Sequence, residues 1–204
     1  MLAGHGLAWF NPDTYARELV AQLGLGLAEA NGRAWEHGRS RLEAAIANGA
    51  NHAFETTLGG NTIPEMLAKA SRSHDVVMLF CGLASAELHI RRVQLRVASG
   101  GHPIGEDKIR ERWVTSRANL VKLLPRLSRL QVFDNSAEAL PGREIPDPVL
   151  VLEMSAGRMV LPDPQNVNAL KRTPEWARPI VQAAIELQSA TRGATSATGS
   201  AKKA

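Results

Sequence analysis

Residues 76–83, VVMLFCGL, form the stretch that decides the fold. This apolar run has the length of one strand and no charged residue, which is typical of a central strand buried on both faces of a sheet. Helical patterns precede and follow it, over about 64–73 and 86–99. Strands that alternate with helices in this way predict an α/β fold, with a mostly parallel sheet and helices on both faces.

The chain before this strand contains two further helical patterns and a second short strand. Residues 11–13, Asn-Pro-Asp, predict a helix start, because asparagine caps, proline suits the first helical position and the acid lies in the first turn. This helix is expected to end at a glycine of the segment 24–26, and a longer helix spans 28–48 with Trp35 on its buried side. The segment 52–56, HAFET, is compatible with a strand.

The chain after the strand continues the alternation. Ser85 is placed to cap the helix that follows, and a pair of glycines at 100 and 101 separates that helix from another over 106–124. Strands are predicted over 130–133, 149–154 and 159–161, with a hairpin turn at 156–157 between the last two. A last helix is predicted over 174–189. One domain is therefore expected over 1–190, followed by a disordered tail of small and polar residues over 191–204.

The composition limits the function classes. Lysine and arginine number 24 against 20 aspartates and glutamates, so the formal charge is +4. This excess suits an anionic ligand, but nucleic acid is not favoured, because aromatic residues make up 4% and no basic stripe is interleaved with them. The single cysteine, Cys81, is expected in the core and indicates a reducing compartment. No membrane span or signal peptide is recognised, so the expected location is the cytoplasm, without a membrane partner.

A basic segment, residues 88–112, contains the candidates for an anion site. Its sequence, LHIRRVQLRVASGGHPIGEDKIRER, reads as a basic helix, a glycine-glycine-histidine break and a second basic helix. The break lets the second helix fold back beside the first, so four arginines are expected to turn toward one place: Arg92, Arg96, Arg110 and Arg112. His102 is either a further phosphate contact or a residue of the turn. For the last two arginines the alternative is ion pairing with Glu106 and Glu111.

Acidic and hydroxyl side chains follow the short strand HAFET. Glu55, Thr56 and Thr57 lie where this strand ends, and the carboxyl ends of parallel strands hold the ligands in α/β sheets. Asp13, at the start of the first helix, is expected at the same site. The plainer alternatives are that Asp13 serves the helix dipole and that Glu55 keeps an edge strand soluble.

Five motifs follow one another along the chain: FNPD at 10–13, FETTLGG at 54–60, the apolar strand, RVQLRVASGGH at 92–102 and VFDNS at 132–136. In this order they resemble the zeta-toxin family of P-loop kinases. The resemblance covers about residues 1–136, and PEWARP at 174–179 is similar to the C-terminal part of short bacterial members. It implies a three-layer fold of the P-loop-kinase kind, with a mostly parallel sheet flanked by helices.

The resemblance also implies a function. Members transfer the γ-phosphate of ATP or GTP, bound with Mg²⁺, to a hydroxyl of a small acceptor such as UDP-N-acetylglucosamine. By position, Asp13 corresponds to the aspartate that acts on the acceptor hydroxyl, and Glu55 and Thr57, with Thr56 between them, to the acceptor-binding segment. The four arginines correspond to the phosphate contacts. These roles suit phosphoryl transfer, which needs positioning and neutralised charge. A nucleotide, a small anionic substrate and an antitoxin protein are the implied partners.

One part of the family pattern is missing from this sequence. Members open with a strand and G-x-x-x-x-G-K-[ST], whose lysine and hydroxyl bind the phosphates and Mg²⁺. Here LAGHGLAWFNPD spans residues 2–13, and no lysine occurs before Lys69. The phosphate loop and the first helix are therefore expected to be deleted. Each lost contact is worth roughly 2–4 kcal/mol by analogy with an oxyanion-hole donor, so two losses slow the reaction about 10³- to 10⁶-fold.

The sequence leaves alternatives to an active kinase. One is a catalytically inactive remnant that binds an anion or a partner protein, and another is a start upstream of Met1 that restores the loop. Without the first helix, residues 76–83 are expected to be less buried on one face or covered by a partner chain. His5 and His52 near Glu55 lack the tight spacing of metal ligands, so no metal site is predicted.

Overall fold

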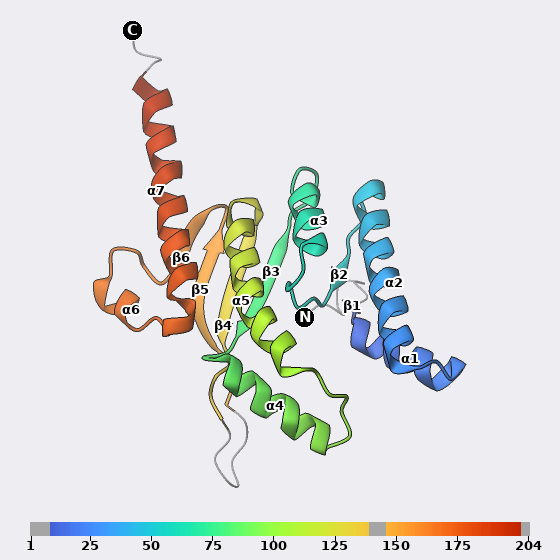
Figure 1. The fold of residues 1–204 in the computed structure, drawn as a ribbon. Helices are drawn as coiled ribbons and strands as arrows, with labels where there is room; N and C mark the ends of the chain where they lie inside the picture. The colour runs from blue at the N-terminus through green and yellow to red at the C-terminus, as the bar shows by residue number, and fades with distance from the viewer. Residues whose placement is uncertain (1–8, 139–145, 201–204) are drawn as a thin grey trace. The chain divides into compact units, whose positions relative to one another are not determined.

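The computed structural model describes residues 9–138 and 146–200, with side chains as far as residue 191. Figure 1 shows the helices and strands along the chain. The chain divides into two compact units, Met1–His74 and Asp75–Ala204, where the sequence predicted one domain over 1–190. Both units combine helices with strands, so the α/β class is confirmed. We describe each unit by itself.

In its described part, residues 9–74, the first unit contains two short parallel strands and three helices. They are β1 (Trp9–Phe10), α1 (Pro12–Leu23), α2 (Leu27–Asn48), β2 (Ala53–Phe54) and α3 (Thr62–Ala70). The predicted helix start is confirmed, because the Asn11 side chain accepts a hydrogen bond from the Thr14 amide and Pro12 opens the helix. α1 ends at Gly24, whose left-handed backbone (φ 64°) suits glycine.

Alanines form the contact between α1 and α2. The hydrophobic cluster consists of Ala16, Ala30 and Ala34, with Tyr15, Leu19 and Leu25 partly buried against them. Small side chains at i and i+4 of α2 let the two helices approach closely. The prediction that Trp35 lies on the buried side is wrong, because Trp35 is 48% exposed. It is one residue beyond Ala34 and therefore lies about 100° further around the helix.

In the described part of the second unit, four strands form one sheet in the order β3-β4-β5-β6. The elements are β3 (Val77–Gly82), α4 (Ala86–Ala98), α5 (Glu106–Leu123), the 3₁₀ turn η2 (Leu124–Arg126), β4 (Arg129–Asp134), β5 (Val149–Ser155), β6 (Arg158–Leu161), α6 (Val167–Lys171), the 3₁₀ turn η3 (Glu175–Ala177) and α7 (Arg178–Ser200). Ser85 caps α4, as predicted, by accepting a hydrogen bond of 3.1 Å from the Leu88 amide.

The sheet of the second unit is mixed. β3 and β4 are parallel, whereas β4–β5 and β5–β6 are antiparallel, so the prediction of a mostly parallel sheet is wrong here. The predicted hairpin accounts for one reversal. Ala156 (φ 47°) and Gly157 (φ 72°) both have positive φ, as in the tight turns that join antiparallel strands.

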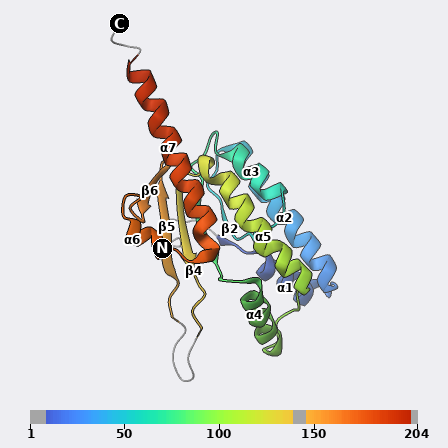
Figure 2. The same cartoon turned by 60° about the vertical axis from the view of Figure 1, so that its left-hand side comes forward.

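Helices α5 and α7 cover one face of this sheet, as Figure 2 shows. The largest fully buried side chains are Leu120, Leu130, Val132, Leu152 and Ile180. On the other face of β3, Val77 and Leu79 are 60% and 58% exposed, and Cys81 is also exposed. The prediction that β3 is buried on both faces, with Cys81 in the core, is therefore wrong. The exposed residues alternate with covered ones along the strand, and they agree with the expectation of one less buried face.

The last helix is longer than predicted. It begins at Arg178, after the turn η3, and runs to Ser200, so it includes positions 191–200 of the predicted disordered tail. The helical backbone can continue there because the segment contains no proline. Residues 201–204 of that tail lie outside the described residues. Nowhere in the described part of the chain is a helix long and apolar enough to cross a membrane.

Candidate functional site

The parallel strands β1 and β2 end side by side, and a polar residue follows each of them. Asn11 follows β1, and Glu55 follows β2 as the sequence predicted. The Glu55 amide donates to the Phe10 carbonyl at 2.9 Å, which extends the pairing of the strands by one residue. The side-chain amide of Asn11 donates to Glu55 Oε2 at 2.6 Å. We call this place, defined by Asn11, Asp13 and Glu55, the strand-end edge.

Asn11 connects two elements at this edge. Its Oδ1 accepts the Thr14 amide at 3.0 Å and caps α1, while its Nδ2 binds Glu55. The first turn of α1 carries Asp13, whose side chain is exposed. The carboxylate of Glu55 and the helix turn that bears Asp13 are therefore fixed by one side chain, which limits their freedom to move relative to each other.

The hydroxyls of the two threonines after Glu55 differ in their hydrogen bonding. Thr56 Oγ1 accepts the Leu58 amide at 3.1 Å, a local bond that shapes the turn. Leu58 has a positive φ of 53° and is 3% exposed, so it anchors the segment in the unit. Thr57 is exposed, and among the described residues its hydroxyl has no hydrogen-bond partner. Thr57 is thus the hydroxyl that this segment leaves available.

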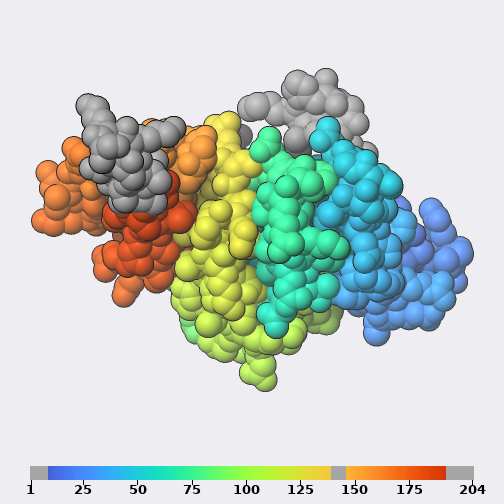
Figure 3. All heavy atoms as spheres, turned by 90° about the horizontal axis from the view of Figure 1, so that it is seen from above, coloured from blue at the N-terminus to red at the C-terminus, as the bar shows by residue number. Residues whose placement is uncertain are grey.

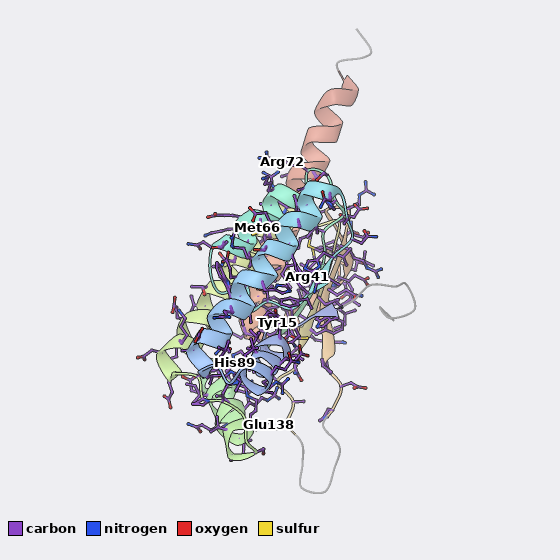
Figure 4. The ribbon with its side chains drawn as sticks, turned by 90° about the vertical axis from the view of Figure 1, so that its right-hand side faces the viewer. Tyr15, Arg41, Met66, Arg72, His89 and Glu138 are labelled. Atoms are coloured by element: carbon purple, nitrogen blue, oxygen red, sulfur yellow. The ribbon has the colours of Figure 1, made fainter. Side chains whose placement is uncertain are left out.

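An aromatic cluster supports the strand-end edge. Phe10, the last residue of β1, is 6% exposed, and its ring centroid lies 5.9 Å from that of Tyr15 and 5.6 Å from that of His37. Tyr15 stacks on His37 at 4.6 Å, and the Arg41 guanidinium lies 5.4 Å from the centre of the Phe10 ring (Figure 4). Sequence reasoning missed this cluster. The spacing of His37 and Arg41, i and i+4 on one helix, is the signal that could have indicated it.

In the second unit, two of the four candidate arginines bind protein groups. Arg92 Nη2 donates to the Ala137 carbonyl at 2.8 Å, in the segment that follows β4. Arg110 forms an ion pair with Glu87, at the start of α4. The pairing lowers the pKa of Glu87 and raises that of Arg110, mainly through their hydrogen bond. The ion-pair alternative therefore describes Arg110: its ion-pair partner is Glu87, and the charge of Glu106 adds a smaller contribution that also raises the pKa of Arg110.

The other two candidate arginines are not engaged in this way. Within the described residues, the side chains of Arg96 and Arg112 make no hydrogen bond or ion pair. Arg96 lies just before the glycine break, and its carbonyl accepts the Gly101 amide at 2.9 Å. A Cβ at Gly101 would lie 2.7 Å from Arg96 Cγ, so this position requires glycine. His102 follows and is partly buried.

The fold-back predicted for the basic segment is confirmed, because α4 and α5 pack against each other. The four arginines do not share one partner or one direction, because Arg92 and Arg110 bind different parts of the second unit. Arg92 donates to the segment after β4 and Arg110 pairs with the start of α4, so that of the four candidates only Arg96 and Arg112 make no hydrogen bond or ion pair within the described residues. The acidic candidates lie in the first unit and the arginines in the second.

Sequence reasoning also missed a polar network at the carboxyl ends of β3 and β4. Asp134 Oδ1 accepts hydrogen bonds from the Ser136 amide at 3.1 Å, from the Ser136 hydroxyl and from Trp176 Nε1 at 3.1 Å. The Ser136 hydroxyl oxygen accepts the Ala84 amide at 2.8 Å. A Cβ at Gly82 would lie 2.1 Å from the Trp176 ring, so the strand needs glycine there. The FDNS motif at 133–136, which overlaps the end of β4, is the sequence signal for this network.

Arg117 is a further arginine near these strand ends. Its guanidinium lies 3.4 Å from the centre of the Trp113 ring, and it donates to the Trp113 and Trp176 carbonyls at 2.8 and 3.3 Å. Trp113 Nε1 in turn donates to the Leu83 carbonyl at 3.1 Å. Burial lowers the pKa of Arg117. Arg117 thus joins α5 to η3, and Trp113 joins α5 to the residue that follows β3.

Comparison with known proteins gives one partial similarity. No protein-family model matches the chain, and no solved structure matches it. An uncharacterized protein of Haemophilus influenzae is 36% identical over 61 residues, which cover 29% of this chain and 44% of that protein. The chain therefore spans less than half the length of this relative.

Proposed function

We propose that the chain is a zeta-toxin-like kinase, which transfers the γ-phosphate of ATP or GTP to a hydroxyl of a small acceptor such as UDP-N-acetylglucosamine. The observation that carries the proposal is the strand-end edge, where Asn11 holds Glu55 and caps the helix turn of Asp13. Carboxylates on fixed backbone are the groups that orient an acceptor hydroxyl and take its proton.

Three candidate residues of the first unit have a role in this proposal: Asp13, Glu55 and Thr57. Asp13, which is exposed, accepts the proton of the hydroxyl that is phosphorylated. Glu55 is bound by Asn11 through Oε2, so Oε1 is available to accept a hydrogen bond from a neighbouring hydroxyl. Thr57 donates or accepts at a further hydroxyl. An acceptor rich in hydroxyls, such as a sugar, matches this set of groups.

The arginines of the second unit divide into two roles. Arg96 and Arg112 bind phosphate groups, since neither makes a hydrogen bond or ion pair within the described residues. Arg92 and Arg110 hold α4 in place through Ala137 and Glu87. Arginines suit phosphate because their planar fork donates two parallel hydrogen bonds. His102 lies in the connection between α4 and α5 and is a further candidate contact for phosphate.

ATP or GTP with Mg²⁺ supplies the phosphoryl group when it is bound. The residues present fit this group in part. Arg96 and Arg112 suit phosphate oxygens, but the sequence contains no G-x-x-x-x-G-K-[ST] motif to bind the β- and γ-phosphates. We therefore assign no step to this chain at those phosphates and confine its roles to the acceptor and to charge neutralisation.

A second candidate function is an inactive relative of these kinases that binds an anion or a partner protein. The exposed face of β3 favours it, because Val77 and Leu79 are 60% and 58% exposed. Contiguous exposed apolar residues often mark a surface that binds another protein. Under this reading the arginines bind an anion without transfer of a phosphoryl group.

Incubation of the full chain with UDP-N-acetylglucosamine and Mg-ATP or Mg-GTP, followed by mass spectrometry, tests the first proposal. The expected product is the acceptor with one added phosphoryl group. Asp13→Asn should reduce the rate about 10²- to 10⁴-fold, the usual contribution of a general base. Glu18→Gln is the matched control, because Glu18 is an exposed acid on the same helix, and it should leave the rate unchanged.

Calorimetry with Mg-ATP in the absence of acceptor separates the two candidates. A kinase binds the nucleotide, and the Arg96→Gln variant binds it more weakly. If no product forms with either nucleotide and calorimetry detects no nucleotide binding, the kinase proposal fails and the anion- or partner-binding function stands.

A further inference from the structure

A groove of about 380 Å³ lies between α2 and α3 of the first unit. Figure 3 shows the atoms of these two helices next to each other, and Figure 4 labels Met66 and Arg72 at the groove. The lining residues are Glu43, Ile46 and Ala47 on α2 and Met66, Lys69, Arg72 and Ser73 on α3 and the turn after it. The volume is within the range of roughly 300–1,000 Å³ typical of small-molecule sites.

The charged residues of the groove give it a positive character. Lys69 and Arg72 are exposed, and neither makes an ion pair within the described residues. Glu43 is already paired with Arg39 at 3.1 Å, so its negative charge is partly offset. The C-terminal end of α3 carries the equivalent of about half a negative charge. The two positive charges of Lys69 and Arg72 are larger than this, so a net positive charge remains. A ligand that supplies an anionic group is therefore favoured.

The remaining lining residues are apolar. Ile46 and Met66 are partly buried and lie on opposite walls, one on each helix. Methionine is flexible and adapts its shape to apolar groups. Ala47, which is exposed, leaves space between these walls because its side chain is small. The groove can thus hold a short apolar group against Ile46 and Met66 while Lys69 and Arg72 bind the head.

We propose that this groove binds a small amphiphilic anion, with a carboxylate or phosphate monoester at Lys69 and Arg72 and a short alkyl or aryl body between α2 and α3. The Ser73 hydroxyl, which is 2.9 Å from His74 Nδ1, adds a polar group at the same end. No residue of the groove belongs to the strand-end edge, so the site is independent of the proposed kinase function. The Asp13→Asn variant should bind these anions like the wild type.

Titration calorimetry on the full chain tests the proposal with four probes: hexanoate, hexyl phosphate, hexanol and inorganic phosphate. The two amphiphilic anions should bind saturably, and whichever binds more tightly identifies the head group. Hexanol lacks the charge and inorganic phosphate lacks the apolar body, so each should bind at least about tenfold more weakly. Equal affinity of hexanol and the anions, or of inorganic phosphate and hexyl phosphate, would overturn the proposal.

Variants locate the binding in the groove. Lys69→Gln/Arg72→Gln should weaken the amphiphilic anions at least about tenfold, because it removes both charge-assisted contacts. Ala47→Leu should also weaken them, since it fills the space between the walls. The control is Arg33→Gln, because Arg33 is an exposed cation of α2 that is paired with Glu29 and does not line the groove. Unchanged affinity in the double variant, with a circular dichroism spectrum like the wild type, would refute the site.

Discussion

The side-chain amide of Asn11 donates to Glu55 Oε2 at 2.6 Å, and this bond joins residues 44 positions apart in the sequence. The same side chain caps α1 through the Thr14 amide. A helix start and an acidic site residue thus depend on one asparagine. Both of its polar atoms are used, so no common substitution reproduces both contacts.

Substitution of Asn11 should show these two contacts separately. Asn11→Ala removes both and should lower the free energy of unfolding by about 1–2 kcal/mol, mostly through the lost cap. Asn11→Asp keeps an acceptor for the Thr14 amide but faces Glu55 with a second carboxylate. The repulsion between the two carboxylates should lower the free energy of unfolding of Asn11→Asp, and the Asn11→Asp/Glu55→Gln double variant should recover part of that loss. Urea denaturation measures all three, and an unchanged free energy of unfolding in Asn11→Ala would contradict the structure.

Two glycines of α2 should respond to alanine in opposite directions. Gly32 has no atom within 4 Å of an added Cβ, so Gly32→Ala should stabilise the helix by about 0.5–1 kcal/mol. At Gly38 the Cβ would lie 2.7 Å from Phe10 Cε1, and the Phe10 ring is held against Tyr15 and His37. Gly38→Ala should destabilise by about 1–3 kcal/mol.

Thermal unfolding of the two glycine variants, side by side with the wild type, measures the contrast. Each variant is the control of the other, because both change glycine to alanine within one helix. A raised midpoint in Gly38→Ala would contradict the close packing of Phe10 on Gly38, and a lowered midpoint in Gly32→Ala would contradict the open space at Gly32.

His52 should make the stability depend on pH. Burial lowers the pKa of His52 below its ordinary value near 6.5, and the charge of Arg41 lowers it further. The unfolded chain therefore binds a proton more readily than the folded one, so stability falls as the pH drops through 6.5 and levels off below the folded pKa. Its Nε2 is buried and has no hydrogen-bond partner in the described structure.

His52→Phe tests this dependence, because phenylalanine keeps the stacking on Phe54, whose centroid is 5.4 Å away, and removes the titrating nitrogen. The variant should be more stable than the wild type, and the gain should be larger at about pH 5 than at about pH 8. Thermal unfolding at both pH values measures it. The same gain at both would show that His52 does not contribute to the pH dependence.

Arg92 and Arg96 should separate stability from binding. Arg92→Gln removes the 2.8 Å bond to the Ala137 carbonyl and should cost about 1–2 kcal/mol of unfolding free energy. Arg96→Gln removes no internal bond of the described structure and should change stability by less than about 0.5 kcal/mol. Under the proposed function it should weaken Mg-ATP binding about tenfold or more. If urea denaturation shows the stability loss in Arg96→Gln and calorimetry shows the loss of Mg-ATP binding in Arg92→Gln, the two assigned roles are wrong.

Local rules account for the parts of the fold that the sequence predicted correctly. The start of α1 at Asn11 and the cap of α4 at Ser85 each depend on a side chain and an amide three residues later. The hairpin turn at Ala156 and Gly157 depends on backbone conformations within that turn. Contacts between residues this close in sequence do not depend on distant parts of the chain.

The errors concern what covers a surface, which no local pattern contains. Trp35 has the apolar character of a core residue, but the alanine face of α2 packs on α1 and leaves it 48% exposed. Cys81 lies in an apolar strand, yet α5 and α7 cover the other face of that strand. Burial depends on neighbours that come from elsewhere in the chain.

The sequence by itself determined the starts of α1 and α4, the approximate strand positions and the types of side chain at the candidate site, because these follow from local hydrogen bonds and periodicity. The tertiary structure decided which of those side chains remain available. It joined Asn11 to Glu55, bound Arg92 to Ala137 and Arg110 to Glu87, and left Arg96 and Arg112 without a hydrogen bond or ion pair in the described residues. A hydrogen bond needs its two atoms within about 3 Å, and for residues far apart in sequence the folded chain alone sets that distance.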